Sequence, residues 1–304
     1  MVDLELKFPE GFFDEEVRDG TTVTKKRKEI WAVELDLLNK LQKVCDEHNL
    51  KFFLDSGSLL GAVRSSGMIP WDNDIDVVML RKDYDLLIHE YSSYFDYPYF
   101  LQSFYSDKEY YRGHAQLRNS ATTGLVIPEK DIVSYNQGIF LDIFPLDAIP
   151  DDNDLAEKLK GKLEKQYHIL RQEQSPKWPT NSKFKKLLRI ERTCLLRRIF
   201  GDENTEYQSI ENELRNNNDG EFIDKIFFRI TLKENWKKIK RSDYADTIYK
   251  EFEFLRCPIP KGYDRILKVL YGPTYMIPQK EPNMHDAKGT IFDADKPYSF
   301  YKKQ

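Results

Sequence analysis

Two aspartates that share one face of a predicted strand are the first feature of this sequence with a chemical consequence. Asp74 and Asp76 flank Ile75, and the apolar segment 77–80 follows them. Residues two apart in a strand project to the same side of a sheet. Two adjacent carboxylates repel, so one takes up a proton unless a cation lies between them. Because oxygen ligands favour Mg²⁺ or Mn²⁺, the pair predicts a divalent-metal site.

A third acid interrupts another apolar run. Asp142 is the single charged residue of GIFLDIF, residues 138–144. Burying an unpaired charge costs on the order of several kcal/mol, so such a residue is paired, metal-bound or part of a site. Alone, Asp142 fits a structural role and a site role equally well. Beside the Asp74/Asp76 pair the site role is favoured, and we expect all three acids to be catalytic and metal-binding.

A glycine-serine turn lies upstream of the acids. Gly57 and Ser58 stand between a predicted strand over 50–54 and a predicted helix that starts near Leu59. A glycine lets a ligand approach the backbone closely. The first turn of a helix offers unpaired N–H groups and the positive end of its dipole, which bind phosphate. The turn therefore predicts a phosphate-binding position beside the metal site.

The elements that must position these residues follow from hydrophobic periodicity. Ile30 to Cys45 form one apolar stripe, which predicts a helix over 27–48 preceded by an N-terminal arm at 1–26. Asp83 is expected to cap a helix over 84–91, whereas the similar Asp-x-Asp residues Asp293 and Asp295 are assigned to a loop. Further segments are assigned as follows: strand 75–80, partly antiparallel strands within 97–127, a buried central strand over 138–144 closed by Pro145 and Pro150, and a short helix ending at Gly272.

These elements predict an α/β (α+β) protein. We expect a catalytic core at 27–150, a mainly helical region at 151–257, and a C-terminal segment at 258–304 that packs back on the core. The chain has 304 residues, of which 40% are hydrophobic and 13% aromatic, enough for a packed core.

The charge and the cysteine content argue against several classes of protein. A net charge of −4 gives no general case for nucleic-acid binding. Three widely spaced cysteines argue against a zinc ribbon or a disulfide scaffold. No apolar run reaches the roughly 18 residues of a membrane span, and the start of the chain does not read as a secretory signal. We therefore expect a cytoplasmic protein.

The run from Gly57 to Leu87 resembles the LicD family, which includes fukutin and fukutin-related proteins. It follows the pattern G[TS]-x-LGA-x-R-x-x-G-x-IPWD-x-D-[IM]-D. Segments at 114–126, 138–147 and 267–286 are similar to further motifs of the family. The resemblance covers most of 28–286 and is weakest between 151 and 260.

This resemblance implies a nucleotidyltransferase-like mixed sheet flanked by helices. Asp74 and Asp76 match the family's metal-binding pair, and Asp142 matches its third carboxylate. The substrate-binding positions implied are Gly57, Ser58, Arg64, Arg118 and Thr122, with the arginines meeting phosphate oxygens.

The family also implies a reaction. Its members transfer phosphocholine or ribitol phosphate from a CDP-linked donor to a hydroxyl of a surface glycan, teichoic acid or lipopolysaccharide. The expected cofactor is Mg²⁺ or Mn²⁺. The expected partners are a CDP-choline or CDP-ribitol type donor and a glycan or lipid-linked glycan acceptor. Two alternatives keep the same fold: transfer of nucleotidyl groups to a small or sugar substrate, and a catalytically silent scaffold. The intact acids argue against the scaffold.

Some positions depart from the family pattern. Asn73 replaces a common aspartate but is expected to point away from the metal pair. Gln116 replaces a common lysine, which bears on donor preference, and Asp286 replaces the second histidine of a pair, which leaves the role of His285 open. Trp71 is interpreted as a packing residue and His114 as an ordinary strand or surface residue. The aromatic residues of 91–105 are assigned mostly to the core, with one or two available for a choline cage.

A basic amphipathic segment lies at 181–200. It carries seven basic residues and one acid, Glu191. The favoured interpretation is a helix whose apolar side packs on the core and whose charges face water. The alternative is that this helix docks the acceptor or an anionic membrane surface, which would place the protein peripherally at the inner membrane face.

Overall fold

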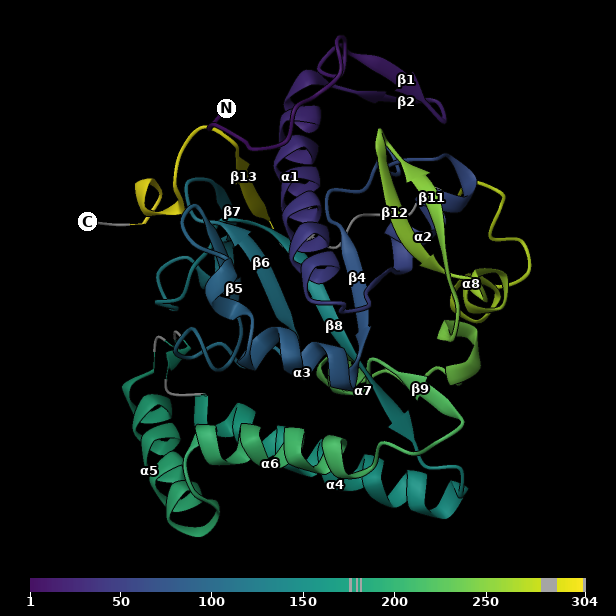
Figure 1. Cartoon of the computed structure of the whole chain (residues 1–304). Coiled ribbons are helices and arrows are strands. Elements are labelled where there is room, and N and C mark those ends of the chain that lie inside the picture. Colours follow the sequence, from purple (N-terminus) through teal and green to yellow (C-terminus); the bar gives the residue numbers. More distant parts are fainter. Residues whose placement is uncertain (175–176, 179, 181, 280–288, 303–304) are drawn as a thin grey trace. The chain divides into compact units, whose positions relative to one another are not determined.

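A computed structural model describes residues 1–174, 177–178, 180, 182–279 and 289–302. The chain divides into two compact units (Figure 1). Unit 1 comprises residues 1–145 and 242–304, and unit 2 comprises residues 146–241. Each unit is described by itself.

Unit 1 is built on a mixed sheet. Strand β8 (Ile139–Ile149) has β4 (Asp76–Leu80) on one side, followed by β3 (Phe53–Leu54). It also pairs with β6 (Ala115–Asn119), which in turn pairs with β5 (Tyr99–Gln102). The β3–β4, β5–β6 and β6–β8 pairs are antiparallel, whereas the arrows of β4 and β8 point the same way in Figure 1. The expected mixed α/β fold is confirmed.

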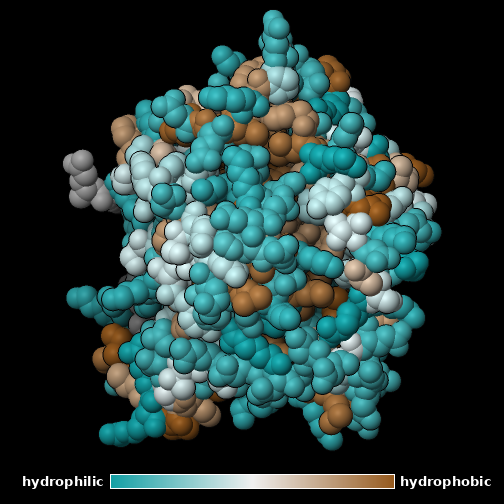
Figure 2. Space-filling model, in the orientation of Figure 1, coloured by the Kyte–Doolittle hydropathy of each residue, from teal (hydrophilic) through white to brown (hydrophobic). Residues whose placement is uncertain are grey.

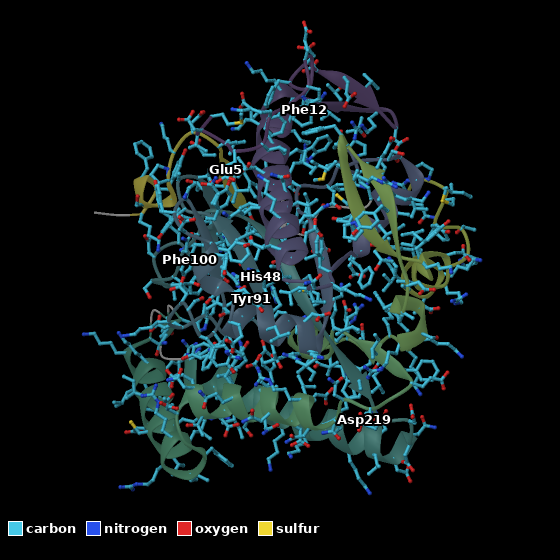
Figure 3. All side chains as sticks on the ribbon, viewed as in Figure 1. Glu5, Phe12, His48, Tyr91, Phe100 and Asp219 are labelled. Atoms are coloured by element: carbon cyan, nitrogen blue, oxygen red, sulfur yellow. The ribbon has the colours of Figure 1, made fainter. Side chains whose placement is uncertain are left out.

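Helix α1 (Lys25–Glu47) packs against β6. The Thr24 side chain caps it by accepting from the Arg27 N–H. Its apolar face is wider than the single stripe predicted, because Trp31, Ala32 and Leu35 are also fully buried. At its far end, the His48 ring stacks on Tyr91 with 4.0 Å between centroids, and both are labelled in Figure 3. The helix is thus enclosed around much of its circumference.

Helix α2 (Ser56–Arg64) connects β3 to the loop before β4. It packs against α8 (Tyr263–Tyr271) and against the hairpin of β11 (Thr247–Phe252) and β12 (Leu255–Pro260). Helix α8 ends at Gly272, as predicted. Helix α3 (Arg81–His89) follows β4, so Asp83 lies in its first turn and not at its cap. The remaining strands of unit 1 are β1 (Glu16–Arg18), β2 (Thr21–Val23), β7 (Thr123–Val126) and β13 (Thr290–Asp293).

The N-terminal arm contains the β1–β2 hairpin. Two further local predictions were wrong. Asp293 is the last residue of β13 and not a loop residue. Strand β8 continues through Pro145 to Ile149. Its pairing with β6 ends at Ile143, and its pairing with β9 (Phe222–Asp224) starts at Asp147. Pro145 therefore falls between two ladders, where its missing N–H breaks no bond in either register.

Unit 2 is mainly helical. Helix α4 (Asn153–Gln174) contacts α5 (Lys183–Phe200), α6 (Glu203–Asn216) and α7 (Ile226–Leu232). Strand β9 pairs with the end of β8 and with β10 (Ile239–Lys240). The last part of the expected helical region, from Ser242, lies in unit 1 and includes the β11–β12 hairpin. Within the described residues, no helix is both long and apolar enough to cross a membrane.

Helix α5 contradicts the packing that was favoured for it. Thr193 is its one buried residue, while Phe184, Leu195 and Ile199 are more than half exposed. Periodicity gives the amphipathic pattern of a helix but does not say whether its apolar side meets a core.

Candidate active site

Three carboxylates from two strand segments meet in unit 1. Oxygens of Asp74, Asp76 and Asp142 lie within 4.8 Å of one another. The backbone brings them together, because the Asp142 N–H donates to the Ile75 carbonyl over 2.9 Å. Asp76 starts β4, and Asp142 lies within β8. The structure therefore gathers the acids that the sequence singled out, although Asp74 precedes the strand.

The first turn of α2 holds the segment that carries Asp76. The Asp76 N–H donates to Ser58 Oγ over 3.0 Å, and the Asp55 N–H donates to the Asp76 carbonyl over 2.9 Å. A Cβ on Gly57 would lie 2.4 Å from Oδ2 of Asp72. A Cβ at position 57 would therefore displace the Asp72 carboxylate. Gly57 and Ser58, which were predicted to precede the helix, lie within its first turn and border the acidic segment.

The loop between α2 and the acids is fixed by residues far away in the sequence. Glu253, in the turn of the β11–β12 hairpin, accepts from the Met68 N–H over 2.8 Å. Arg18, in β1, donates to the Met68 carbonyl over 3.0 Å and to Glu253 over 2.5 Å. The Glu253 N–H also donates to the Ser66 carbonyl over 2.8 Å. Together these bonds determine how the chain enters the segment 72–76.

Asp142 is oriented by Gln116, in strand β6, and by His114, which precedes that strand. Gln116 Nε2 donates to Asp142 Oδ1 over 2.6 Å. His114 Nε2 lies 3.2 Å from the same oxygen. His114 is therefore no ordinary surface or strand residue: it is buried against an acid of the site. Alternation along β6 places both side chains on the face toward Asp142.

Arg118 continues this row of side chains. Its guanidinium donates to Gln116 Oε1, to Gln102 Oε1 over 2.5 Å and to the Gly138 carbonyl over 2.6 Å. The side chain is buried, and burial lowers its pKa. The structure thus places Arg118 behind Gln116, bonded to groups of the protein.

Two acids that the sequence reasoning passed over lie beside the cluster. Burial and then the charge of Asp74 raise the pKa of Asp72 well above its usual range. The same two causes, in the same order, raise the pKa of Glu34. Both carboxylate oxygens of Glu34 are buried without a hydrogen-bond partner among the described residues.

The position of Glu34 follows from the face of α1. Arg27 Nη1 and Trp31 Nε1 both donate to the Asp72 carbonyl, over 3.0 and 3.1 Å. Glu34 comes three residues after Trp31 and seven after Arg27, so all three share one helix face. A glutamate inside an otherwise buried helical face was the available signal in the sequence. For Asp72, the signal was its place in the IPWD motif.

The other predicted site residues differ in whether their polar groups are free to bind a substrate. Arg64 ends α2 with its guanidinium carbon 5.9 Å from the Trp71 ring centroid. Its Nε and Nη2 are buried without a hydrogen-bond partner in the described part of the chain, and burial lowers its pKa. Thr122 is fully buried: its hydroxyl donates to the Asn119 carbonyl over 2.7 Å and accepts from the Ile139 N–H over 2.9 Å. Thr122 is therefore used within a turn, and His285 lies outside the described residues.

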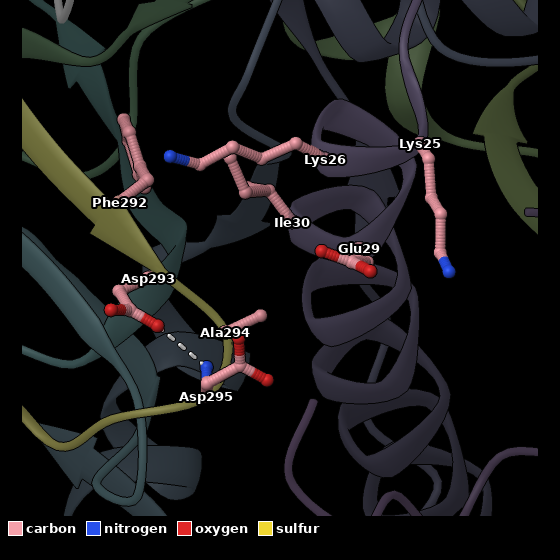
Figure 4. Close-up of a pocket in the computed structure, with 8 residues that line it drawn as sticks. All are labelled: Lys25, Lys26, Glu29, Ile30, Phe292, Asp293, Ala294 and Asp295. Atoms are coloured by element: carbon pink, nitrogen blue, oxygen red, sulfur yellow. Dashed lines mark hydrogen bonds between the residues drawn. The ribbon is translucent and has the colours of Figure 1, made fainter. Parts of the chain in front are cut away.

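A separate groove of about 400 Å³ lies between the start of α1 and β13 (Figure 4). The Asp295 N–H donates to Asp293 Oδ1 over 2.8 Å on its wall. None of the clustered carboxylates lines it. Its residues are Lys25, Lys26, Glu29, Ile30, Phe292, Asp293, Ala294 and Asp295. The candidate site is therefore placed by the carboxylates and not by this groove.

The carboxylate cluster suits a hard divalent cation. All three groups offer oxygen ligands, which Mg²⁺ and Mn²⁺ prefer. Asp72 and Glu34 add further acids whose ionised forms are disfavoured by the charge of Asp74, and a divalent ion would relieve this repulsion. Arg64 supplies unpartnered N–H donors of the kind that bind phosphate.

A mixed sheet that brings a glycine-serine helix against clustered carboxylates defines a domain of the nucleotidyltransferase type. Residues 49–153 match the family model described as "LicD/FKTN/FKRP, nucleotidyltransferase domain". This segment contains Gly57 and all three clustered aspartates. Residues 49–153 thus form a domain of the LicD family, as the motifs of this segment indicated.

A named relative agrees with this assignment. The chain is 23% identical over 264 residues to the lipopolysaccharide cholinephosphotransferase LicD of Haemophilus influenzae, covering 81% of this chain and 90% of that protein. It is 33% identical over 70 residues to an uncharacterised protein of Rickettsia prowazekii, covering 23% of this chain and 25% of that protein. An uncharacterised protein of Rickettsia typhi is 38% identical over 47 residues, which cover 16% of this chain and 15% of that protein.

Proposed function

We propose that this protein is a divalent-metal-dependent phosphotransferase. It transfers phosphocholine, or another alcohol phosphate such as ribitol phosphate, from a CDP-linked donor to a hydroxyl of a cell-surface glycan, teichoic acid or lipopolysaccharide. The observation that carries the proposal is the gathering of Asp74, Asp76 and Asp142 within 4.8 Å. The similarity to a protein named lipopolysaccharide cholinephosphotransferase supports phosphocholine as the first group to test.

Each residue of the candidate site has a role that follows from its chemistry. Asp74, Asp76 and Asp142 would hold Mg²⁺ or Mn²⁺, which when bound neutralises the charge of a pyrophosphate. Arg64 donates to a phosphate oxygen through N–H groups that have no partner in the described part of the protein. Gln116 and His114 fix the orientation of Asp142 through Oδ1. Gly57 admits Asp72 against α2.

The reaction is an in-line displacement at phosphorus. The acceptor hydroxyl oxygen forms a bond to the phosphorus that bears the small alcohol, and the bond from that phosphorus to the bridging oxygen breaks. CMP leaves with the bonding electrons. The hydroxyl proton passes to a carboxylate, for which Asp142, Asp72 and Glu34 are the candidates in this region.

A release assay tests the proposal. The protein is mixed with a candidate glycan acceptor and with CDP-choline, CDP-ribitol, CTP or ATP, each in Mg²⁺ and in EDTA, and CMP and pyrophosphate are measured. We expect CMP from a CDP-alcohol in Mg²⁺ only, and none from Asp76→Asn. Pyrophosphate release from CTP or ATP would instead establish nucleotidyl transfer. No turnover and no thermal stabilisation by any nucleotide would indicate a silent scaffold.

A further inference from the structure

Helix α5 exposes an apolar stripe on one face, which the exposed residues Glu191 and Arg192 interrupt between Leu188 and Leu195. Phe184, Leu188, Leu195 and Ile199 follow one another at steps of four, seven and four residues, so they lie on one face. Their exposed fractions are 69%, 47%, 57% and 61%. Thr193, the buried residue of the helix, is nine residues from Phe184, two and a half turns away and thus on the opposite face. Figure 2 shows brown atoms among teal ones at the lower left, where Figure 1 draws α5.

The same helix carries a strong positive charge beside the stripe. Its residues Lys183–Phe200 include seven basic side chains and one acid. Arg197 pairs with Glu203 over 2.6 Å, and Arg189 donates to the Trp178 carbonyl over 3.0 Å. In the described part of the chain no ion pair engages the other five, which are Lys183, Lys185, Lys186, Arg192 and Arg198. These cations are available to an external anion.

Apolar and basic groups together select the partner. A polyanion alone would attract the cations but would leave the stripe in water, whereas an apolar protein surface would leave the cations unpaired. The surface of an anionic phospholipid bilayer satisfies both, because acyl chains take up the stripe while headgroup phosphates meet the flanking Lys and Arg. The helix is about 27 Å long at 1.5 Å per residue, which suits a helix lying in the interface.

We propose that α5 is a membrane-docking helix that lies in the headgroup region of an anionic bilayer, with Phe184, Leu188, Leu195 and Ile199 inserted. The helix is held to α4 by its Thr193 side, where the Thr193 hydroxyl donates to the Gln172 carbonyl over 3.4 Å. The inserted stripe is on the opposite face, so docking requires no unfolding of unit 2. This inference is independent of the proposed phosphotransfer.

Co-sedimentation of the full chain with vesicles tests the docking. One set of vesicles is phosphatidylcholine, and the other is phosphatidylcholine with phosphatidylglycerol. Two variants separate the contributions: a charge variant, Lys185→Gln/Arg192→Gln/Arg198→Gln, and an apolar variant, Phe184→Ser/Leu188→Ser/Leu195→Ser/Ile199→Ser. A matched control, Leu155→Ser/Lys165→Gln, changes exposed residues of α4 in the same unit. All altered side chains are exposed, and circular dichroism checks that each variant is folded.

We expect the wild type and the control to bind anionic vesicles and to bind neutral ones far more weakly. A cation near such a surface contributes about a fivefold factor in affinity, so the charge variant should bind roughly a hundredfold more weakly. The apolar variant should lose binding even at low salt.

The depth of the helix gives a second measurement. An environment-sensitive dye is attached at position 195 through Leu195→Cys in a Cys194→Ser background, since Cys45 and Cys257 are buried. Its emission should shift to the blue with anionic vesicles and stay unchanged with neutral ones.

Three results would overturn the proposal. The first is absence of binding to anionic vesicles at low salt. The second is full binding by the apolar variant, which would show a purely electrostatic surface for a polyanionic partner. The third is a wild-type oligomer in analytical ultracentrifugation that the apolar variant turns into a monomer, which would make α5 an interface between copies of the chain.

Discussion

Replacing Gly57 by alanine should disturb the acidic site without unfolding the protein. The added Cβ would lie 2.4 Å from Asp72 Oδ2, about 1 Å inside normal contact. The carboxylate is the end of a side chain and can move, so the strain is relieved by displacing Asp72. Alanine also favours the helix by about 1 kcal/mol, which offsets residual strain. We therefore expect a nearly unchanged melting temperature.

Activity should respond much more strongly than stability. A misplacement of about 1 Å in a catalytic arrangement costs about a hundredfold in rate. The assay is CMP release from CDP-choline in Mg²⁺, with Mn²⁺ affinity measured by calorimetry on the same preparations. Gly57→Ala should lower kcat/KM about a hundredfold and weaken Mn²⁺ binding.

Gly61→Ala is the matched control. It lies in the same helix, but its Cβ would be 2.3 Å from the Gly67 carbonyl oxygen, which belongs to backbone. Backbone in a fixed loop yields less readily, so this variant should lose about 1–3 kcal/mol of stability.

A double-mutant cycle isolates the steric cause. In an Asp72→Ala background the carboxylate that Gly57→Ala displaces is gone, so adding Gly57→Ala should change the Mn²⁺ affinity and the residual rate little. Normal kcat/KM in a folded Gly57→Ala variant, or equal effects of Gly57→Ala in both backgrounds, would refute this reasoning.

Three further changes probe the same region. Asp76→Asn should lower kcat/KM more than a hundredfold, roughly 3 kcal/mol of transition-state stabilisation, while thermal stability in EDTA holds or rises because a repulsion is removed; near-normal turnover would contradict the metal assignment. Glu34→Gln should become increasingly more stable than the wild type as pH rises in EDTA. The folded-state pKa of Glu34 is raised, so the wild type loses stability from the unfolded pKa upward toward the folded one, whereas glutamine does not titrate. If the free energies of unfolding of the two proteins, measured by urea denaturation, depend on pH in the same way, the raised pKa of Glu34 is refuted. Gln116→Leu should lower kcat about tenfold or more with a smaller change in KM, because Asp142 loses a positioning hydrogen bond; an unchanged kcat in steady-state kinetics would show that Asp142 needs no such support.

Much of the core of the fold could be predicted because local pattern and packing agree there. The periodicity of α1 and the apolar run of β8 each have one reasonable structural interpretation, and the structure confirms both elements. Pro145 misled the prediction because a change of strand partner leaves no local trace. The apolar face of α5 misled it for a similar reason, since periodicity reports a face and not what covers it.

In the candidate site, too, some residues could be predicted from the sequence and others could not. Asp74, Asp76 and Asp142 were conspicuous as charges in apolar strands. Glu34 was not, because a glutamate in a long helix is ordinarily solvated, and only the bonds from the Arg27 and Trp31 side chains to Asp72 show which way that face points. The tertiary register of α1 against the acidic loop is a long-range property that no short window of sequence contains.

The bonds around Met68 also set a time order for biosynthesis. Glu253 follows Met68 by 185 residues, and Arg18 is separated from Glu253 by 235. At about 5–20 residues per second, a ribosome needs roughly 10–40 s to reach Glu253 after Met68 has been added. During that interval the acidic segment exists without the hairpin that fixes its approach, whereas the helices of unit 2 are already made. The nascent chain therefore carries Asp74, Asp76 and Asp142 well before the bonds that fix the entry to the segment 72–76 can form.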